Sequence, residues 1–264
     1  MTMRGSFRTL DGCEIAYWVD GSADAPALLL SNSLGATHKM WDDQVPVFAK
    51  HWRTVTYDTR GHGASAAPAG AYSLDRLGRD ALDLLDHLQI GKTHFCGISL
   101  GGMTGQWLGA HAPTRVDRLI LAHTSAYLPP AAAWQERIET VLKNGVCSIA
   151  EAVVGRWVSP AFKDNHPDKF TELVEAVAKI DAAGYSGCCA AIRDMDQRPL
   201  LSAINAPSLI LAGLCDQATP LAHSQLLVDA MPNAKLATTD GAHLSNLEYV
   251  DQFNNLVLKH VLMN

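Results

Sequence analysis

The sequence predicts an α/β protein with a largely parallel sheet, and three observations lead to this fold class. Short apolar runs that suit buried strands alternate with longer stretches whose apolar residues recur at helical spacing. The runs at 27–33, 116–125 and 207–216 are rich in consecutive apolar residues, as strands buried on both faces are. The alternation lapses between 126 and 204, where helix-like stretches follow one another, so we expect a helical insertion there.

Two short strands open the chain and form a predicted hairpin. The segments 6–12 and 13–21 contain aromatic and β-branched residues and meet at Asp11 and Gly12, a pair that suits a tight turn. The run at 27–33 then changes from apolar to small polar residues, which marks the end of a buried strand. The sheet is therefore expected to begin with these three strands.

The stretch 73–91 gives the clearest helix. Ser73 is a good N-cap, because its hydroxyl can accept a hydrogen bond from a free N–H of the first turn. Leucines recur at helical spacing through this stretch, and Gly91 follows as a stop. The other elements expected before the insertion are a helix at about 39–50, a strand at 52–63 that breaks at Gly61, a strand at 92–99, a helix at 100–113 and a strand at 116–125.

The chain divides into a core and one insertion. We expect residues 1–125 and 205–264 to form the core, because the strand–helix alternation resumes after residue 204. Residues 126–204 contain no convincing strand. The helix-like stretches of the insertion lie at 131–145, 148–158 and 170–180. The elements expected after it are a strand at 207–216, a helix near 221–231, a strand at 234–243 and a helix at about 247–262.

Composition and charge argue against several classes of partner. The 264 residues carry a formal charge of -6, so the chain lacks the basic surplus that binds nucleic acid. Its N-terminus has no signal-peptide core, and its apolar runs are too short to span a bilayer. We expect a cytoplasmic protein that acts on a small molecule, with no membrane partner; its oligomeric state stays open.

The six cysteines show no metal or disulfide spacing, so we expect buried free thiols.

A serine flanked by glycines is the strongest candidate for chemistry. Gly97, Ser99 and Gly101 fall between a predicted strand and a predicted helix in the stretch FCGISLGG. This pattern in that context is typical of a nucleophile elbow, a sharp turn that exposes a serine hydroxyl above a sheet. Glycines let the strand and the helix approach where a side chain would clash. We therefore expect Ser99 to be a nucleophile; the alternative is an ordinary turn serine.

The chain also contains candidates for the base and the acid that a serine nucleophile needs. In hydrolases with this elbow, the acid and then the histidine follow the serine along the chain. His243 comes after the last predicted strand and Asp216 ends the strand before it, so both are expected at the sheet edge where Ser99 emerges. Asp194 and Asp196 are rival acids within the insertion. The alternatives are a structural loop histidine for His243 and a helix cap for Asp216.

An oxyanion hole is expected beside the serine. A tetrahedral intermediate carries a negative oxygen, which backbone N–H donors stabilise. One donor is expected from Leu100, the residue after the nucleophile, and the other from Leu34 in the loop SNSLG. The alternative for that loop is an ordinary strand-to-helix connection. The sequence has no phosphate-binding loop, dinucleotide fingerprint or metal-ligand spacing, so no cofactor and no metal is expected.

These motifs together resemble the α/β-hydrolase superfamily. The combination of SNSLG, MW, YDTRGHG, GISLGGMTG, GLCDQATP, GAHLSN and RDMDQRP is similar, more narrowly, to the 3-oxoadipate enol-lactonases of bacterial aromatic catabolism, in the β-ketoadipate pathway. The resemblance runs from the first strand to the last helix. It implies an α/β-hydrolase fold with a mostly parallel sheet flanked by helices, a serine hydrolase activity, and a helical cap formed by residues 126–204.

The resemblance also implies a substrate and a mechanism. The substrate would be a small enol-lactone that carries a carboxylate. Ser99 would attack its carbonyl with the help of His243, and water would then release 3-oxoadipate from the acyl-enzyme. A carboxylate needs donor-rich surroundings in the cap, where an arginine can bind it through two hydrogen bonds. The candidate substrate-binding residues there are Trp134, Arg137, Arg156, Trp157 and Arg193.

Two other kinds of function stay open at this point. The same triad suits a general carboxylesterase, a carbon–carbon bond hydrolase or a cofactor-free perhydrolase. A non-enzymatic binding protein on the same fold is the other alternative, because fold alone does not establish chemistry. The intact set of Ser99, Asp216 and His243 argues against a binding protein, which needs none of the three.

Overall fold

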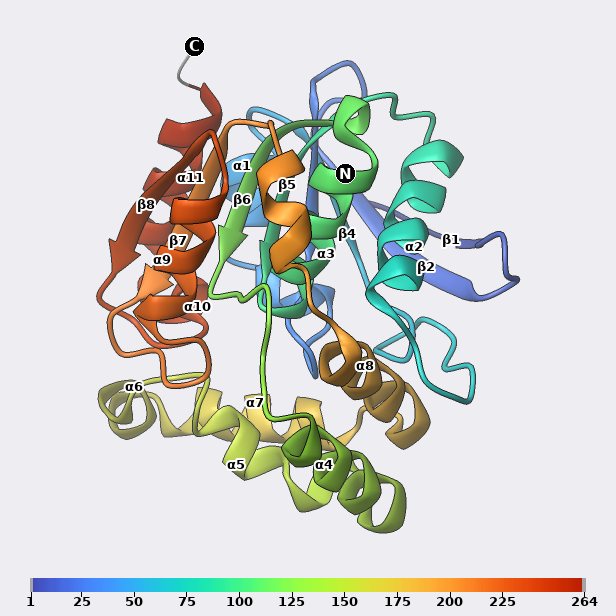
Figure 1. The fold of residues 1–264 in the computed structure, drawn as a ribbon, viewed down its shortest axis with the longest axis vertical. Helices are drawn as coiled ribbons and strands as arrows, with labels where there is room; N and C mark the ends of the chain where they lie inside the picture. Colours follow the sequence, from blue (N-terminus) through green and yellow to red (C-terminus); the bar gives the residue numbers. More distant parts are fainter. Residues whose placement is uncertain (1, 263–264) are drawn as a thin grey trace.

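An eight-stranded sheet forms the centre of the computed structural model, which describes residues 2–262 (Figure 1). Its strands are β1 (Met3–Arg8), β2 (Glu14–Asp20), β3 (Ala27–Ser31), β4 (Arg53–Tyr57), β5 (Thr93–Ile98), β6 (Val116–Ala122), β7 (Ser208–Gly213) and β8 (Ala234–Thr239). They lie in the order β1-β2-β4-β3-β5-β6-β7-β8. The pairs β1–β2 and β2–β4 are antiparallel, and every other pair is parallel. The predicted fold class is confirmed.

The middle strands of the sheet are buried on both faces. Every residue of β3, β5 and β7 is buried, which explains their apolar sequences, since such strands have no solvent face. β1 lies at the edge and buries only Phe7. The predicted hairpin at Asp11 and Gly12 is present, and it pairs Phe7 with Ile15.

Helices flank the sheet, and a second group of helices lies beyond one of its ends. The α-helices are α1 (Val45–Phe48), α2 (Leu74–His87), α3 (Leu100–His111), α4 (Ala131–Asn144), α5 (Ala150–Val154), α6 (Pro160–Asn165), α7 (Pro167–Ala178), α8 (Ala182–Asp194), α9 (Leu221–Ala230), α10 (Ser245–Glu248) and α11 (Val250–Leu262). The 3-10 helices are η1 (His38–Trp41), η2 (Pro113–Arg115), η3 (Val146–Ser148) and η4 (Arg198–Ala203). α3 packs against β5 and β6, and α9 packs against β7 and β8.

The helices between β6 and β7 lie where the parallel strands end. Figure 1 shows α4, α5, α6 and α7 together beyond the end of the sheet toward which the arrowheads of β6 and β8 point. Ligand sites of parallel sheets form outside the carboxyl ends of the strands. The fold therefore places these helices over the edge where the candidate nucleophile, acid and base were expected.

The helix predicted at 39–50 is wrong as a single helix. The structure has two short pieces there, η1 and the four-residue α1. Pro46 lies at the start of α1, where its ring has no N–H to donate and would clash with a preceding helical turn. Gln44, between the two pieces, instead donates through its side chain to the carbonyl of Asn246 at 2.9 Å.

The strand expected to break at Gly61 ends earlier, at Tyr57. The carboxylate of Asp58 accepts hydrogen bonds from the backbone N–H groups of His38 at 2.7 Å and Ala64 at 2.8 Å. These two bonds turn the chain away from the sheet directly after Tyr57. A buried aspartate within the loop therefore ends β4.

Two helices of the insertion, α6 and α8, were not predicted. α8 consists largely of small residues, so its hydrophobic periodicity is weak. Its N-cap is Asp181, whose side chain accepts a hydrogen bond from the N–H of Gly184 at 2.9 Å. Residues 184–192 are all buried, and α8 packs closely against α4. Tertiary packing therefore stabilises a helix that the local sequence pattern does not predict.

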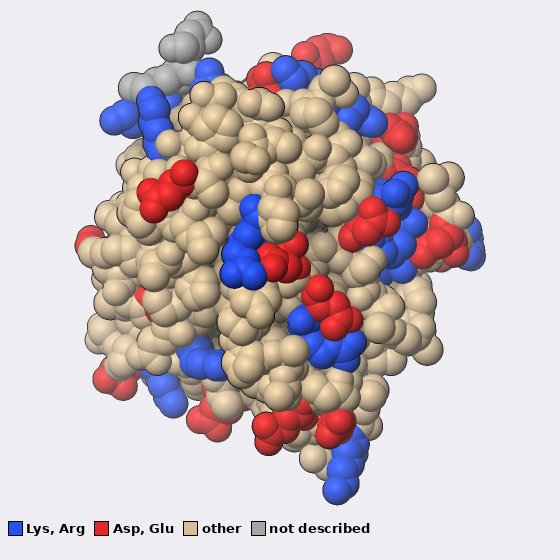
Figure 2. Space-filling model, viewed as in Figure 1, with Lys and Arg blue, Asp and Glu red and all other residues tan. Residues whose placement is uncertain are grey.

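The surface carries mixed charge. On the face shown in Figure 2, lysines and arginines stand in small groups beside aspartates and glutamates among the described residues.

Within residues 2–262, no helix combines the length and hydropathy that crossing a bilayer requires. The expectation that all six cysteines are buried is wrong for Cys147, in η3, and for Cys215, in the turn after β7, which are both exposed.

A close approach between Gly61 and Gly184 joins the loop after β4 to α8. A Cβ atom on Gly184 would lie 2.2 Å from the Cα of Gly61, far inside van der Waals contact. Because the obstructing atoms belong to the backbone, we expect Gly184→Ala to lower the free energy of unfolding by about 1–3 kcal/mol. The melting temperature of a chain of this size should then fall by roughly 2–10 °C in a calorimetric scan.

Gly91→Ala is the matched control for this substitution. No heavy atom lies within 4 Å of a Cβ built at Gly91. The control should leave the melting temperature unchanged or slightly raised, because alanine restricts the unfolded chain more than glycine does. A melting temperature for Gly184→Ala at or above that of the control would contradict the contact between the loop and α8.

Candidate active site

Ser99 occupies the turn between β5 and α3 with an unusual backbone conformation. Its φ of 57° and ψ of -114° lie where residues other than glycine are strained. A Cβ on Gly97 would lie 2.2 Å from the carbonyl oxygen of Gly101, and a Cβ on Gly101 would lie 2.2 Å from that of Ser31. The close approach of β5, α3 and β3 therefore requires both glycines. Ser99 stands at the N-terminus of α3, where the helix dipole favours negative charge.

Asp216 and His243 meet at the same edge of the sheet, after β7 and β8. Oδ2 of Asp216 accepts a hydrogen bond from Nδ1 of His243 at 2.9 Å, and both side chains are buried. The carboxylate also accepts from the N–H groups of Ala218 at 2.8 Å and Thr219 at 3.0 Å, and from the Thr219 hydroxyl at 2.7 Å. Burial alone would raise the pKa of Asp216, but the charge of His243 and hydrogen bonds from histidine hold it well below its ordinary value.

The bond with Asp216 determines which nitrogen of His243 is free. An ionised carboxylate can only accept, so Nδ1 carries the proton and Nε2 presents a lone pair. An imidazole in this tautomer can act as a general base. Within residues 2–262, the Ser99 hydroxyl forms no hydrogen bond with His243. Proton transfer between these two side chains therefore belongs to the proposal below.

The rival acids lie at the surface, away from this pair. Asp194 forms an ion pair with Arg193 at 2.7 Å, and Asp196 forms one with Arg198 at 2.6 Å. Both carboxylates are exposed to solvent. Asp216 is thus the candidate acid that the fold brings to His243.

The loop after β3 offers one free donor at the position expected for the oxyanion hole. The N–H of Ser33 points to Sδ of Met40 at 3.4 Å, and the N–H of Gly35 donates to Nε2 of His62 at 2.9 Å. The N–H of Leu34, between them, has no acceptor among the described residues. Leu100 is the first residue of α3, so its N–H has no partner within the helix. Both predicted donors are therefore available to a bound oxyanion.

His62 supports this loop, a role that the sequence pattern did not reveal. Its Nδ1 lies 3.2 Å from the carbonyl oxygen of Arg60, so Nδ1 donates and Nε2 accepts from Gly35. Burial lowers the pKa of His62, which keeps the ring neutral as this arrangement requires. Arg60 is in turn held by the buried carboxylate of Asp80, with one bond at 2.7 Å. The only sequence signal was RGHG itself, and it does not say which loop the histidine contacts.

Trp157 joins the helices between β6 and β7 to both loops of the site. The side chain is buried, and a Cβ atom on Gly35 would lie 3.5 Å from the nearest carbon of its ring. Its carbonyl accepts a hydrogen bond at 2.8 Å from the N–H of Leu244, the residue after His243. Trp157 thus packs on the loop of Leu34 and is bonded to the loop of His243.

Trp134 and Arg193 are engaged within the helical segment itself. Nε1 of Trp134 donates to the carbonyl of Leu128 at 2.9 Å, which fixes the orientation of the indole ring. Arg193 binds Asp194 through two hydrogen bonds at 2.7 Å and also donates to Gln135. The guanidinium of Arg193 is therefore already occupied by acceptors of the chain.

Arg137 and Arg156 differ from Arg193, because neither forms an ion pair with a carboxylate among residues 2–262. The guanidinium of Arg137 lies 4.7 Å from the centre of the Trp134 ring. Burial of its charged end lowers the pKa of Arg156, although much of the residue is exposed, and the positive charge of Arg137 lowers that pKa further. The two guanidiniums thus lie close enough to repel each other without a counter-ion from the described chain.

Tyr185 lies beside these arginines and was not among the sequence candidates. Its side chain is fully buried, and its hydroxyl lacks a hydrogen-bond partner among the described residues. Burial raises the pKa of Tyr185; Arg137 is near enough to oppose that shift, but no well-aligned hydrogen bond joins the two groups. The ring of Tyr185 also packs against Gly35. The hydroxyl of Tyr185 therefore lies near two arginines without a carboxylate partner among the described residues, and its ring contacts the loop of Leu34.

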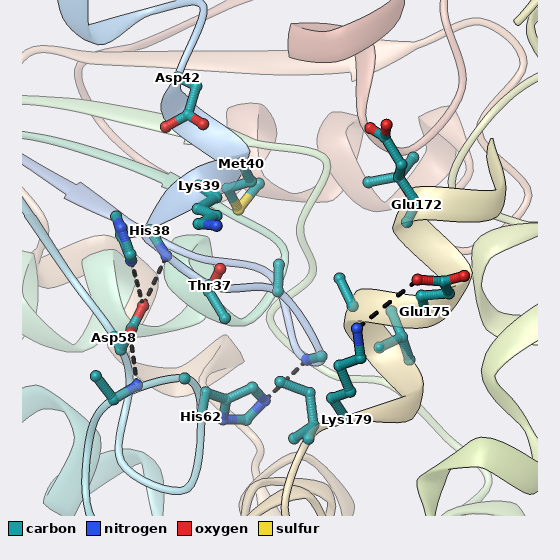
Figure 3. Close-up of a pocket in the computed structure, with 18 of the residues that line it drawn as sticks. Thr37, His38, Lys39, Met40, Asp42, Asp58, His62, Glu172, Glu175 and Lys179 are labelled. Carbon is teal, nitrogen blue, oxygen red and sulfur yellow. Dashed lines mark hydrogen bonds and ion pairs between the residues drawn. The ribbon is translucent and has the colours of Figure 1, made fainter. Parts of the chain in front are cut away.

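A cavity of about 970 Å³ is lined in part by Gly35 and the residues after it in that loop. Figure 3 shows His38, Asp58 and His62 on one wall, and Glu175 and Lys179 on the opposite wall, which belongs to α7 and the residues after it. Some of its polar groups pair with one another, at 3.0 Å for Nδ1 of His38 with Asp58 and 3.7 Å for Lys179 with Glu175. The candidate nucleophile, acid and base do not line this cavity, so we assign no substrate to it.

Comparison with known proteins places this geometry in a family. A family model described as the alpha/beta hydrolase fold matches residues 26–144. The 3-oxoadipate enol-lactonase 2 of Acinetobacter baylyi is 42% identical over 251 residues, which cover 94% of each chain. The chain belongs to the α/β-hydrolase family. Its predicted resemblance to the enol-lactonases within this family is confirmed.

Two solved structures extend the likeness to the whole fold of this α/β hydrolase. A hydrolase from Pseudomonas aeruginosa PA01 is 43% identical, with a TM-score of 0.95 over 98% of each chain. The enol-lactonase from Burkholderia xenovorans LB400 is 34% identical, with a TM-score of 0.96 over 98% of this chain and all of that one. The expected α/β-hydrolase fold is thus confirmed.

Proposed function

We propose that this α/β hydrolase opens the ring of 3-oxoadipate enol-lactone to give 3-oxoadipate through a serine acyl-enzyme. The observation that carries the chemistry is the buried 2.9 Å bond between Asp216 and His243 at the sheet edge where strained Ser99 emerges. The substrate is supported by 42% identity to an enol-lactonase over nearly the whole chain. The assignment of Ser99, His243 and Asp216 as nucleophile, base and acid is part of the proposal.

Acylation follows from the tautomer of His243. Oγ of Ser99 attacks the lactone carbonyl while its proton passes to Nε2 of His243. The carbonyl oxygen becomes an oxyanion, which the N–H groups of Leu34 and Leu100 stabilise. The bond between the carbonyl carbon and the ring oxygen then breaks. The leaving enolate takes the proton back from His243 and becomes a ketone, still attached to the acyl group.

Deacylation repeats the same steps with water as the nucleophile. Nε2 of His243 takes a proton from water, and the resulting hydroxide attacks the ester carbon of the acylated Ser99. When the tetrahedral intermediate collapses, Oγ of Ser99 leaves and regains the proton. Asp216 stays ionised throughout, orients the imidazole and stabilises the imidazolium that forms in each half-reaction.

Arg137, Arg156 and Tyr185 would bind the carboxylate of the lactone. Among the described residues, two guanidiniums have no carboxylate partner and one buried hydroxyl has no hydrogen-bond partner, and together they can donate the hydrogen bonds that a carboxylate accepts. Tyr185 and Trp157 both pack on Gly35, next to the proposed oxyanion donor. A substrate held by its carboxylate in this place would have its reacting carbonyl near the loop of Leu34.

The helical segment of residues 126–204 acts as a cap in this proposal. Its contacts with the loops of Leu34 and His243 support a role in shaping the pocket and excluding water. Residues 1–125 and 205–264 would be the catalytic core. A place in the breakdown of aromatic compounds follows from the proposed substrate, and a cytoplasmic location stays a prediction from the sequence.

The proposal is tested by steady-state kinetics on purified protein. We expect the ultraviolet absorbance of the enol-lactone to disappear at a kcat/KM of roughly 10⁴ M⁻¹s⁻¹ or more, as for an enzyme acting on its own substrate. A panel of neutral short-chain esters serves as the comparison. Esters turned over far faster than the lactone would replace the lactonase assignment with that of a general carboxylesterase.

The carboxylate subsite gives a separate prediction. Arg156→Met and Arg137→Met should each raise KM for the lactone about 10- to 100-fold, because a charged hydrogen bond contributes roughly 1.5–3 kcal/mol. Hydrolysis of 4-nitrophenyl acetate, which has no carboxylate, should change less than about threefold. Arg198→Met, at a surface arginine paired with Asp196, is the control. Equal losses on both substrates would contradict a carboxylate subsite.

A further inference from the structure

His123 is a second buried histidine at the centre of the site, outside the proposed triad. It follows β6 directly, and its N–H donates to the carbonyl of Leu211 in β7 at 2.8 Å. The residue is fully buried and has a φ of 48°, a left-handed conformation that residues with side chains rarely adopt. Such strain persists where the surrounding structure fixes it, often at functional sites.

The ring of His123 bridges the loop of the acid and the loop of the base. Its Nδ1 lies 3.5 Å from Oδ2 of Asp216, the same oxygen that accepts from His243, but the two atoms form no well-aligned hydrogen bond, and Nδ1 has no other partner among the described residues. Its Nε2 lies 2.7 Å from Oγ of Ser245, two residues after His243. A Cβ on Gly213 would lie 3.1 Å from this ring, so β7 holds the imidazole closely from the other side.

The groups around His123 fix its protonation. Asp216 faces it from the loop after β7, His243 from the loop after β8, and Ser245 and the charge of Glu248 from α10. Burial lowers the pKa of His123 in spite of the two carboxylates, which favours a neutral ring. The carboxylate of Asp216 can only accept, so Nδ1 carries the proton, and Nε2 accepts from the hydroxyl of Ser245.

We infer that His123 is a positioning residue that supplies an N–H to Asp216 and ties Asp216 to the segment that carries His243. Sharing the carboxylate charge with His123 weakens the pull of Asp216 on a proton at His243. The tie to Ser245 holds the imidazole of His243 in place for proton transfer. This inference rests on the proposed serine chemistry but on no particular substrate.

Two substitutions at position 123 separate positioning from packing. His123→Phe keeps a planar ring but removes both nitrogens, whereas His123→Asn keeps an N–H as many bonds from the backbone as Nδ1. Asparagine also tolerates a positive φ better than most residues. The rate at which a fluorophosphonate labels Ser99 is measured against pH for each purified variant, with its melting temperature beside it.

We expect His123→Phe to slow labelling about 10-fold at the optimum, as small displacements of catalytic groups do. The acid limb of its profile of labelling rate against pH should move up by about 0.5–1 pH unit, because Asp216 then stabilises the imidazolium of His243 more strongly. His123→Asn should recover most of the rate and return the limb toward that of the wild type. If His123→Phe does not fold, Ser245→Ala should show the slower labelling, because it removes the tie between His123 and the segment that carries His243.

The outcomes divide clearly. A folded His123→Phe with an unchanged rate and acid limb, or a folded Ser245→Ala with an unchanged rate, overturns the inference. A His123→Asn variant that labels as slowly as His123→Phe also overturns the inference, because only the packing of the ring would then matter. Wild-type protein that fails to label at all counts against the proposed serine chemistry instead, which keeps the two failures distinguishable.

Discussion

Ser99→Ala should abolish hydrolysis of the enol-lactone, with kcat reduced about 10⁴- to 10⁶-fold, as in other enzymes that lose their nucleophile. The substitution removes the oxygen that would form the acyl-enzyme at the N-terminus of α3. Residual activity would come from water bound near His243. The comparison is made by stopped absorbance assays at high enzyme concentration.

The fold should survive this change. The Ser99 hydroxyl forms no side-chain cap bond at the start of α3, so its loss removes no contact of the helix. Ser224→Ala is the matched control, since Ser224 is a buried serine on α9 whose hydroxyl also lacks a partner among the described residues. We expect full activity from the control. A Ser99→Ala protein within tenfold of wild-type kcat would contradict the nucleophile assignment.

Asp216→Asn should lower kcat about 10⁴-fold, the scale seen when a triad acid becomes an amide. Oδ1 of Asp216 accepts from the N–H groups of Ala218 and Thr219, so the amide oxygen of asparagine has to take that position. The NH₂ group then faces Nδ1 of His243. Two donors cannot share a hydrogen bond, so the imidazole is driven to the tautomer that protonates Nε2, which can no longer accept the proton of Ser99.

Asp194→Asn and Asp196→Asn are the controls for this prediction, because the sequence made both residues rival acids. Each carboxylate is exposed and paired with an arginine, and an exposed pair contributes roughly 1 kcal/mol or less. We expect kcat within about twofold of wild type for both. A loss at either position that matches the loss for Asp216→Asn would refute the choice of acid.

The sequence was most informative where chemistry sits directly beside a strand. Ser99 and Asp216 follow buried apolar strands, His243 follows the mixed polar and apolar strand β8, and parallel strands end at a common edge. The meeting of Asp216 with His243 could therefore be predicted without coordinates, and Ser99 was expected at the same edge. The glycines of the elbow carried a second signal, since their absence of a side chain matters only where backbone elements nearly touch.

The supporting residues could not be predicted in this way. His62, His123 and Tyr185 act through contacts with loops far away in the chain, and nothing in their local pattern names the partner. Tyr185 also sits in α8, a helix built from small residues that burial stabilises. The prediction of one helix at 39–50 is wrong for a local reason, because Pro46 interrupts a stretch whose apolar spacing suits a helix.

The central claim is that Ser99 forms a covalent acyl intermediate with the lactone. It is tested most directly by mass spectrometry of protein quenched in acid during the first turnover, for wild type and for Asp216→Asn, in which deacylation should be slow. Ring opening loses no atoms, so the protein mass should rise by one intact lactone, on the peptide that contains Ser99. Consumption of the lactone with an unmodified Ser99 peptide in both proteins at every quench time would contradict the claim.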